Sequence, residues 1–136
     1  MTPQDAQVIL DENFAAWVRA LQPKVTAIGP QGATLEIPIT DDIVRVGGIV
    51  SGQALATLAD TAMVFACIGH EDAMVPVSTV TLDTQFLRPG VGDQIVAKAE
   101  VTRAGKAMMF ARCTLLTEPN GKSVALATAT FARPVG

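Results

Sequence analysis

The strongest constraint on this fold is the stretch from Gly47 to His70, GGIVSGQALATLADTAMVFACIGH. Its pattern predicts one helix over Ser51 to Ile68, about five turns long, with a serine N-cap and with Gly69 at the C′ position. The predicted helix is apolar on nearly every side, which is typical of a buried helix. Asp60 is the one ionisable group inside it, and a carboxylate in such a place needs partners or a chemical task.

The segments on either side of this helix predict a sheet that surrounds it. Thr2 to Leu21 has helical spacing and a Thr-Pro start, and Val25 to Ile39 alternates around a Gly-Pro-Gln-Gly turn like a hairpin. Four strand-like runs follow the helix, at residues 75–88, 94–103, 107–117 and 122–133. We therefore expect an α+β fold, a single domain over residues 1–136, in which an antiparallel meander curls around the central helix.

Composition and charge argue against several partners. The chain has 136 residues, 49% of them hydrophobic, and a net charge of −3, so it offers no basic field for nucleic acid or anionic lipid. Its most apolar window contains Thr57, Asp60 and Thr61 and is shorter than the roughly 20 residues of a membrane span. No secretion signal opens the sequence, and we expect a cytoplasmic protein.

The chemistry-bearing residue types are sparse. Cys67 and Cys113 fall inside the predicted helix and a predicted strand, as small core residues of a reduced compartment do. No carboxylate-histidine cluster predicts a metal site, and no glycine-rich motif predicts a nucleotide cofactor. The predicted sheet has two edges to protect, and a long strand with few charges favours edge-to-edge pairing of two copies. We therefore expect a homodimer.

Two motifs carry a family resemblance: LATLADTAM at Leu55 to Met63, and STVTLDTQFLRPGVGD at Ser78 to Asp93, followed by a Gly105-Lys106 turn. Together they resemble the acyl-CoA thioesterases of the hotdog fold, and most closely their phenylacetate-degradation branch. The resemblance implies hydrolysis of an acyl-CoA to free CoA and a carboxylic acid. Coenzyme A would be part of the substrate, with no separate cofactor. It also implies an active site at a dimer interface and dimers that often pair into tetramers.

The resemblance also implies roles for individual residues. Asp60 would be the catalytic acid group, as general base or nucleophile, Gly52 would donate its backbone N–H to the oxyanion, and Thr79 would orient the attacking water. Many relatives have His-Gly-Gly where this chain has Ser51-Gly52-Gln53, and some have asparagine at the position of Arg45. The glycine's role carries over because it is a main-chain role, whereas the histidine's role does not carry over to Ser51.

Elementary chemistry independently favours the same site. Thioester hydrolysis needs a base or nucleophile and hydrogen-bond donors aimed at the carbonyl oxygen. The first turn of a helix, here Gly52 and Gln53, supplies unpaired N–H groups and a partial positive charge. Asp60 lies eight residues further on, about 12 Å along the helix axis. One carbonyl would not reach both groups of one chain, so we expect two copies to complete the site.

Each candidate residue also has a purely structural interpretation. Asp60 would then be a hydrogen-bonded structural acid, Thr61 a helix threonine bonded to a preceding carbonyl, and Thr79 an ordinary strand residue. Ser51 is most simply a helix cap. Met63, with Met108, Met109 and Phe86, could line an acyl pocket or belong to the core. Three basic residues could hold CoA phosphates or be solvated strand ends: Arg88, Arg103 and Lys106.

Two other function classes remain open at this stage. A hotdog dehydratase acting on 3-hydroxyacyl thioesters would usually use a histidine, and the single histidine, His70, lies at the wrong end of the predicted helix. There it would complement the helix dipole. A non-catalytic acyl-CoA-binding protein would not need Asp60, although the missing His-Gly-Gly pattern mildly favours it.

Overall fold

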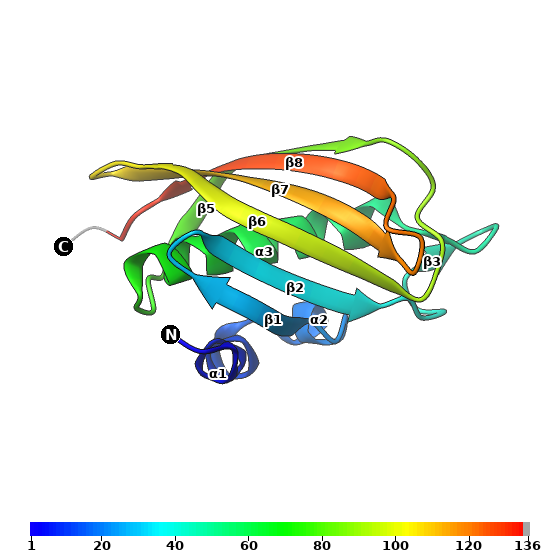
Figure 1. Ribbon diagram of the computed structural model, residues 1–136, viewed down its shortest axis with the longest axis horizontal. Coiled ribbons are helices and arrows are strands. Elements are labelled where there is room, and N and C mark those ends of the chain that lie inside the picture. Colours follow the sequence, from blue (N-terminus) through cyan, green and yellow to red (C-terminus); the bar gives the residue numbers. More distant parts are fainter. Residues whose placement is uncertain (135–136) are drawn as a thin grey trace.

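The central helix, α3 (Gly52–Glu71), lies in the concave side of a six-stranded antiparallel sheet (Figure 1). The computed structural model describes residues 1–134. The sheet contains β1 (Lys24–Gly29), β2 (Gly32–Pro38), β5 (Ser78–Phe86), β6 (Gln94–Ala104), β7 (Met108–Glu118) and β8 (Ser123–Ala132). Two helices, α1 (Pro3–Asn13) and α2 (Ala16–Arg19), precede it, and a small hairpin of β3 (Val44–Arg45) and β4 (Ile49–Val50) leads into α3. This confirms the predicted α+β class.

The strand order corrects one part of the prediction. The order is β1-β2-β6-β7-β8-β5, so only β6, β7 and β8 form a meander, and the expected meander of four consecutive strands is wrong. β2 occupies the place beside β6, with Leu35 opposite Ala97, and β5 pairs with β8 instead, with Leu82 opposite Ala129. Alternating patterns predict strands but do not specify which strands become neighbours. As a result β5 forms an edge of the sheet.

α3 begins where the sequence predicts but ends later. Ser51 is its N-cap, and the Ser51 hydroxyl accepts a hydrogen bond from the Ala54 N–H at 3.2 Å. The predicted end at Gly69 is wrong, because the helix continues to Glu71 and the left-handed C-cap is Asp72, with φ 53°. Gly69 lies inside the helix, where a Cβ would come within 2.6 Å of the Gly29 carbonyl oxygen. Because Gly69 has no side chain, α3 can pack closely against β1 at this point. Gly69 does not end the helix.

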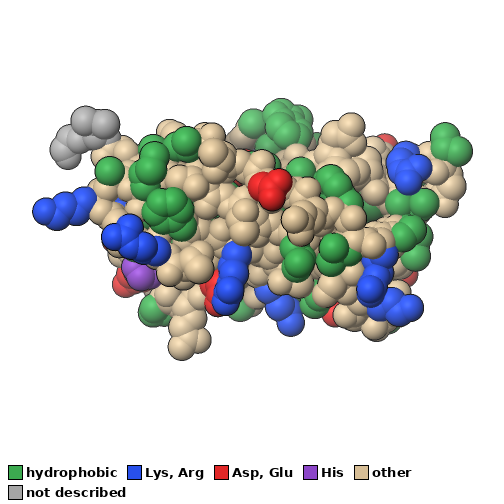
Figure 2. Space-filling view, turned by 90° about the horizontal axis from the view of Figure 1, so that it is seen from above, with side chains coloured by type: hydrophobic (Ala, Val, Ile, Leu, Met, Phe, Trp, Pro, Cys, Tyr) green, Lys and Arg blue, Asp and Glu red, His purple; other side chains and the backbone are tan. Residues whose placement is uncertain are grey.

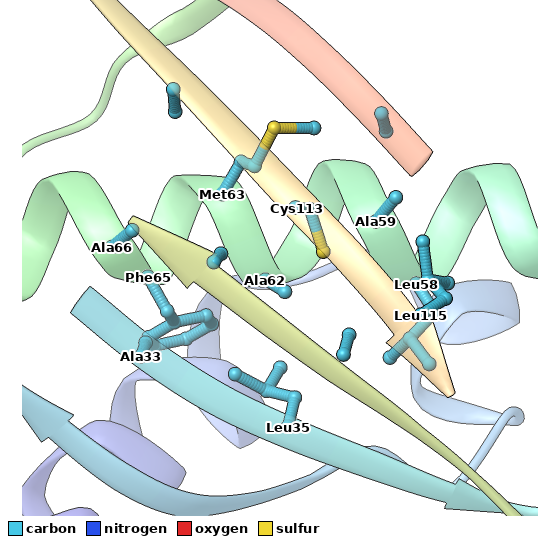
Figure 3. Close-up of a cluster of buried hydrophobic side chains, with 14 of the residues drawn as sticks. Ala33, Leu35, Leu58, Ala59, Ala62, Met63, Phe65, Ala66, Cys113 and Leu115 are labelled. Carbon is cyan, nitrogen blue, oxygen red and sulfur yellow. The ribbon is translucent and has the colours of Figure 1, made fainter. Parts of the chain in front are cut away.

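The core forms between one side of α3 and the concave face of the sheet. Figure 3 shows this packing, in which fully buried Leu58 and Ala62 of α3 face Leu35 and Leu115 of β2 and β7. The expectation that α3 is buried on every side is wrong, since Asp60 and Val64, on its other side, are only half-buried. At 20 residues α3 reaches the length and hydropathy of a membrane span, but 67% of its most apolar window is buried inside the fold. A core helix has the same properties.

The N-terminal segment differs from the single helix predicted through Leu21. α1 starts as expected, with a capping box between Thr2 and Asp5. The helix then ends because Phe14 adopts an extended conformation, and its ring stacks on Phe65 of α3 with centroids 5.3 Å apart. A separate short helix, α2, follows this bend.

Both cysteines are free and buried, as the sequence suggests. Burial raises the pKa of the Cys67 thiol to about 11 and that of Cys113 to about 12. Thiols with such pKa values are almost entirely protonated near neutral pH and are therefore poor nucleophiles.

Gly69→Ala tests the contact between α3 and β1. Alanine normally stabilises a helix interior by about 0.8–1.0 kcal/mol relative to glycine. Here the new methyl group would meet the Gly29 oxygen and Ile28, and we expect a net loss of about 1–2 kcal/mol, within the range of overpacked cores. Urea unfolding measures the effect. Gly29→Ala is the matched control, because a Cβ at Gly29 has nothing within 4 Å and its unfolding midpoint should change little.

Candidate active site

The acid group expected to carry the chemistry, Asp60, lies near the middle of α3 on the side that the sheet leaves uncovered. Its carboxylate oxygen Oδ1 accepts a hydrogen bond from the Thr79 hydroxyl of β5 at 2.9 Å. Burial raises the pKa of Asp60, and the hydrogen bond from Thr79 offsets part of that rise. No salt bridge to Asp60 occurs within residues 1–134. A partly dehydrated, uncompensated carboxylate suits a general base or a nucleophile.

Asp60 lines a groove of about 420 Å³, which is within the usual size range of small-molecule sites. Its walls come from α2, from α3 and from residues 74–79, with Leu82 of β5. The groove is mostly apolar, and its polar lining includes Thr57, Thr61 and Thr79 beside Asp60. The acid therefore lies at the polar spot of an otherwise apolar cleft.

The first turn of α3 provides a second chemical feature, at some distance from Asp60. Gly52 is the first helical residue, and within the described chain its N–H and that of Gln53 have no hydrogen-bond acceptor. The ring of Phe86, at the end of β5, covers Gly52 so closely that a Cβ there would lie 3.2 Å from the ring. Gly52 and Gln53 thus present free donors at the positive end of the helix dipole, next to the end of β5.

Three predicted site residues have mainly structural contacts. The Thr61 hydroxyl donates to the Thr57 carbonyl at 2.8 Å, which is the helix back-bond considered as its alternative, although Thr61 also lines the groove. Met63 is fully buried against the sheet (Figure 3), so its predicted contact with substrate is corrected to a core role. Ser51 is a cap, as described above.

The predicted basic residues lie in two separate places. Arg45, on β3, and Arg88, just after β5, are exposed near the start of α3. Arg103 and Lys106 are exposed at the opposite end of the molecule, around the turn between β6 and β7 (Figure 1). Arg133 connects that turn to the end of α3: it donates to the Gly105 carbonyl at 2.7 Å and forms a salt bridge with Glu71. The length of α3, about 30 Å, separates the two places within one chain.

His70 also lies at that far end, exposed in the last turn of α3. It is therefore remote from Gly52, and the histidine expected of a hotdog dehydratase is not beside the free helix N-terminus. Its position agrees with the role of a cation at the C-terminal end of the helix dipole.

Sequence reasoning missed the groove wall formed by Trp17 of α2 and Val64 of α3. Trp17 appeared only as part of an amphipathic helix, and the bend that separates α2 from α1 has no clear sequence signal. The contact between Phe86 and Gly52 was also missed, because it joins residues 34 positions apart in the chain.

A curved antiparallel sheet wrapped around one long helix is the hotdog fold, and the half-buried acid and free helix N–H groups fit the thioester hydrolases among the proteins with this fold. The family model described as the Thioesterase superfamily matches residues 47–124, more than half of the chain. The chain therefore belongs to the thioesterase superfamily. Within it, the resemblance to the phenylacetate-degradation branch is confirmed.

Several solved structures share this fold over nearly the whole chain. The PaaI protein of Escherichia coli, from the phenylacetic acid degradation operon, is 25% identical, with 98% of this chain and 93% of that chain covered at a TM-score of 0.83. A mutant of the phenylacetic acid degradation protein PaaI from Thermus thermophilus is 26% identical, with coverages of 88% and 100% and a TM-score of 0.77. A thioesterase from Haemophilus influenzae reaches a TM-score of 0.87 at 17% identity, with coverages of 98% and 91%.

Asp60→Asn should make the protein more stable at neutral pH. Because burial raises the pKa of Asp60 in the folded state, the folded state holds a proton that the unfolded chain has already released. Stability is therefore lost as pH rises from the unfolded pKa through the folded pKa, and the loss is complete above it. Asparagine carries no charge and still accepts a hydrogen bond from Thr79.

Urea unfolding as a function of pH measures this effect. The excess stability of Asp60→Asn should be largest near pH 7, should shrink as the pH falls through the raised folded-state pKa of Asp60, and should be nearly gone below about pH 4, where Asp60 is protonated in both states. Asp41→Asn, which removes an exposed carboxylate outside β5, controls for the change in net charge. An Asp60→Asn protein less stable than wild type at pH 7 would contradict a costly buried charge.

Proposed function

We propose that this chain hydrolyses an acyl-CoA thioester, with Asp60 as general base or nucleophile and the Gly52 N–H as oxyanion donor. The observation that carries the proposal is the half-buried Asp60 carboxylate, held by Thr79 at 2.9 Å beside an apolar groove. Membership of the thioesterase superfamily supports thioester hydrolysis in general. The chain needs no cofactor in this scheme, since coenzyme A arrives with the substrate.

The chemistry assigns a task to each group. With Asp60 as base, a water held by Thr79 attacks the thioester carbonyl and gives its proton to the Asp60 carboxylate. The carbonyl oxygen becomes negative and is stabilised by the N–H of Gly52 at the helix N-terminus. The C–S bond then breaks, and the CoA thiolate takes up the proton that Asp60 received from water. With Asp60 as nucleophile, its oxygen bonds to the carbonyl carbon, the C–S bond breaks to release the CoA thiolate, and water then hydrolyses the acyl-aspartyl anhydride to the carboxylic acid and free Asp60.

A second copy of the chain supplies the missing half of this site. Asp60 and Gly52 of one chain are about 12 Å apart along α3, too far for one thioester carbonyl. The free edge at β5 supports pairing: it is nine residues long, all but Thr84 are exposed, and Asp83 is its one charged residue. Figure 2 shows a face of the molecule with scattered apolar side chains and one acidic side chain near its centre. The exposed edge of β5 can therefore form backbone hydrogen bonds with a strand of another copy.

The positions of two contacts along β5 favour this arrangement. Thr79, near the start of β5, touches Asp60, while Phe86, at its end, covers Gly52. In a two-fold symmetric antiparallel pair centred on Leu82, the middle residue, position 78 lies opposite position 86 of the other copy. Thr79 then lies beside the partner's Phe86, and Asp60 lies close to the partner's Gly52.

The same symmetry would bring the predicted basic residues of the two copies to one entrance of the site. The two copies of α3 run in opposite directions, so the start of one helix lies beside the middle of the other, and residues before that start extend toward the other helix's end. Arg45 and Arg88 of one chain and the partner's Arg103 would then surround one entrance, together with the partner's Lys106. Basic groups there would bind the CoA phosphates. Dimers of this kind would pair further into tetramers.

The E. coli relative comes from a phenylacetic acid degradation operon, so phenylacetyl-CoA is the first substrate to test. Free thiol release from a panel of CoA esters measures the activity. Asp60→Asn should lower kcat by at least about a hundredfold, the lower range for loss of a general base. Circular dichroism and light scattering should show an unchanged fold and oligomer. Activity within a few-fold of wild type would refute the role of Asp60.

Gly52→Pro tests the oxyanion donor. Proline is favoured at the first helical position, and the substitution removes only an N–H that has no acceptor within the described chain. We expect kcat to fall by about 10²–10³, as when one oxyanion donor is lost. Gly52→Ala is the matched control, since it keeps the N–H but brings the same Cβ against Phe86. An equal loss in both variants would assign the effect to that contact.

Mixing the two inactive variants tests whether the site is shared. A mixed dimer of Asp60→Asn and Gly52→Pro has one site in which both Asp60 and Gly52 are native, if each site takes one residue from each copy. Random exchange should therefore restore roughly a quarter of the wild-type rate. If each site uses Asp60 and Gly52 of the same chain, every site stays defective and no activity returns.

A further inference from the structure

Trp17, the single tryptophan of the sequence, is 66% exposed although it lies on a wall of the groove beside Asp60. Large aromatic side chains left in solvent next to a cleft mark surfaces that bind something. Trp17 falls inside the segment predicted as one helix, and the bend between α1 and α2 places it on the groove wall.

The segment around Trp17 is firmly held rather than loose. Phe14, three residues before it, stacks on Phe65, and the neighbouring Val18 is buried. The Arg19 Nε donates to the Phe14 carbonyl at 3.0 Å and closes the bend between α1 and α2. Trp17 is thus a large aromatic side chain on an anchored turn of helix, which lowers the entropic cost of a contact with a ligand.

The groove between Trp17 and Asp60 has a definite chemical character. Asp60 is its one charged lining residue among residues 1–134, and no lysine or arginine described there faces into it. Its walls are otherwise mostly apolar and include Phe14, Trp17, Val64, Met74 and Leu82. An acyl group with its own carboxylate would meet Asp60 without a counter-cation and lose its hydration. A group without charge would bury apolar surface.

We propose that the α1–α2 segment, through Trp17, sets the acyl specificity of this protein: the groove holds an uncharged apolar acyl group whose distal end contacts the Trp17 ring. This rests on the proposed thioesterase function, because it is the reacting thioester at Asp60 that directs the acyl group into the groove. Trp17 is a specificity-determining residue in this scheme and takes no part in bond making or breaking.

Steady-state kinetics with four esters tests the proposal: phenylacetyl-CoA, octanoyl-CoA, acetyl-CoA and succinyl-CoA. Wild type should prefer the first two and be slowest with succinyl-CoA. Trp17→Ala should lower kcat/KM for phenylacetyl-CoA and octanoyl-CoA by roughly three- to tenfold, the size of an aromatic or apolar contact, with little change for acetyl-CoA. Trp17→Phe should recover much of the loss for phenylacetyl-CoA. Val8→Ala is the matched control, because Val8 is 53% exposed on α1 and does not line the groove.

The single tryptophan also gives a readout that needs no turnover. Titration of wild type with a non-hydrolysable thioether analogue of phenylacetyl-CoA should shift Trp17 emission to shorter wavelength, because the indole loses water. Free CoA and the analogue of acetyl-CoA should leave the emission unchanged. This measurement keeps the proposal testable if Trp17→Ala does not fold.

The outcomes separate this proposal from the proposed function. Hydrolysis with the same acyl preference in Trp17→Ala overturns the role of Trp17 and leaves the thioesterase assignment intact. An equal loss for all four esters also overturns it, since that pattern marks a structural role. A third outcome also overturns the role of Trp17. If the oligomer of Trp17→Ala dissociates and the remaining activity keeps the wild-type acyl preference, a second copy covers Trp17. Absence of any hydrolysis by wild type refutes the proposed function instead, and an unshifted emission then overturns the groove contact as well.

Discussion

Close packing of α3 against the concave face of the sheet is the interaction on which the rest of this structure depends. Ala59, Ala62 and Ala66 are fully buried on that side, and their small side chains let the helix approach the strands closely. The sheet covers only one side of the helix, because its last strand, β5, is an edge. Asp60 faces that margin, so the fold removes part of its water without providing a cation. The packing that stabilises the domain thus creates the uncompensated carboxylate.

Local patterns predicted much of this arrangement, and contacts between distant segments account for what they missed. The start of α3, its Ser51 cap, the acid within it and the positions of the strands follow from periodicity and capping, which are properties of neighbouring residues. The place of β5 beside β8 depends on contacts between segments that are distant in the sequence, and alternation carries no such information. The prediction for Gly69 failed for a similar reason. Glycine at the end of a helix usually marks a cap, but here a glycine is needed because the backbone of Gly29, 40 residues earlier, leaves no room for a side chain.

The same distinction between local patterns and contacts of distant segments applies to the candidate site. Asp60 and Gly52 were recognisable because a charge in an apolar helix and a free helix start are local features. Trp17 and Phe86 were not, since each acquires its place through a bend or a strand that packs against α3. Met63 illustrates the opposite error, because a flexible apolar side chain near the acid has the same sequence signature whether it faces the core or the groove.

The geometry of a straight helix accounts for the shared site that we propose. A helix aligns its dipole and leaves free N–H groups only in its first turn, so an oxyanion donor of this kind must lie at the end of α3. An acid at that end would be stabilised in its charged form by the helix dipole and would be a weaker base, whereas Asp60, eight residues further on, is partly dehydrated and has a raised pKa. The two requirements, a free helix end and a dehydrated acid, are therefore met at different points of one helix. In the dimer that we propose, two antiparallel copies joined at β5 would bring these points together.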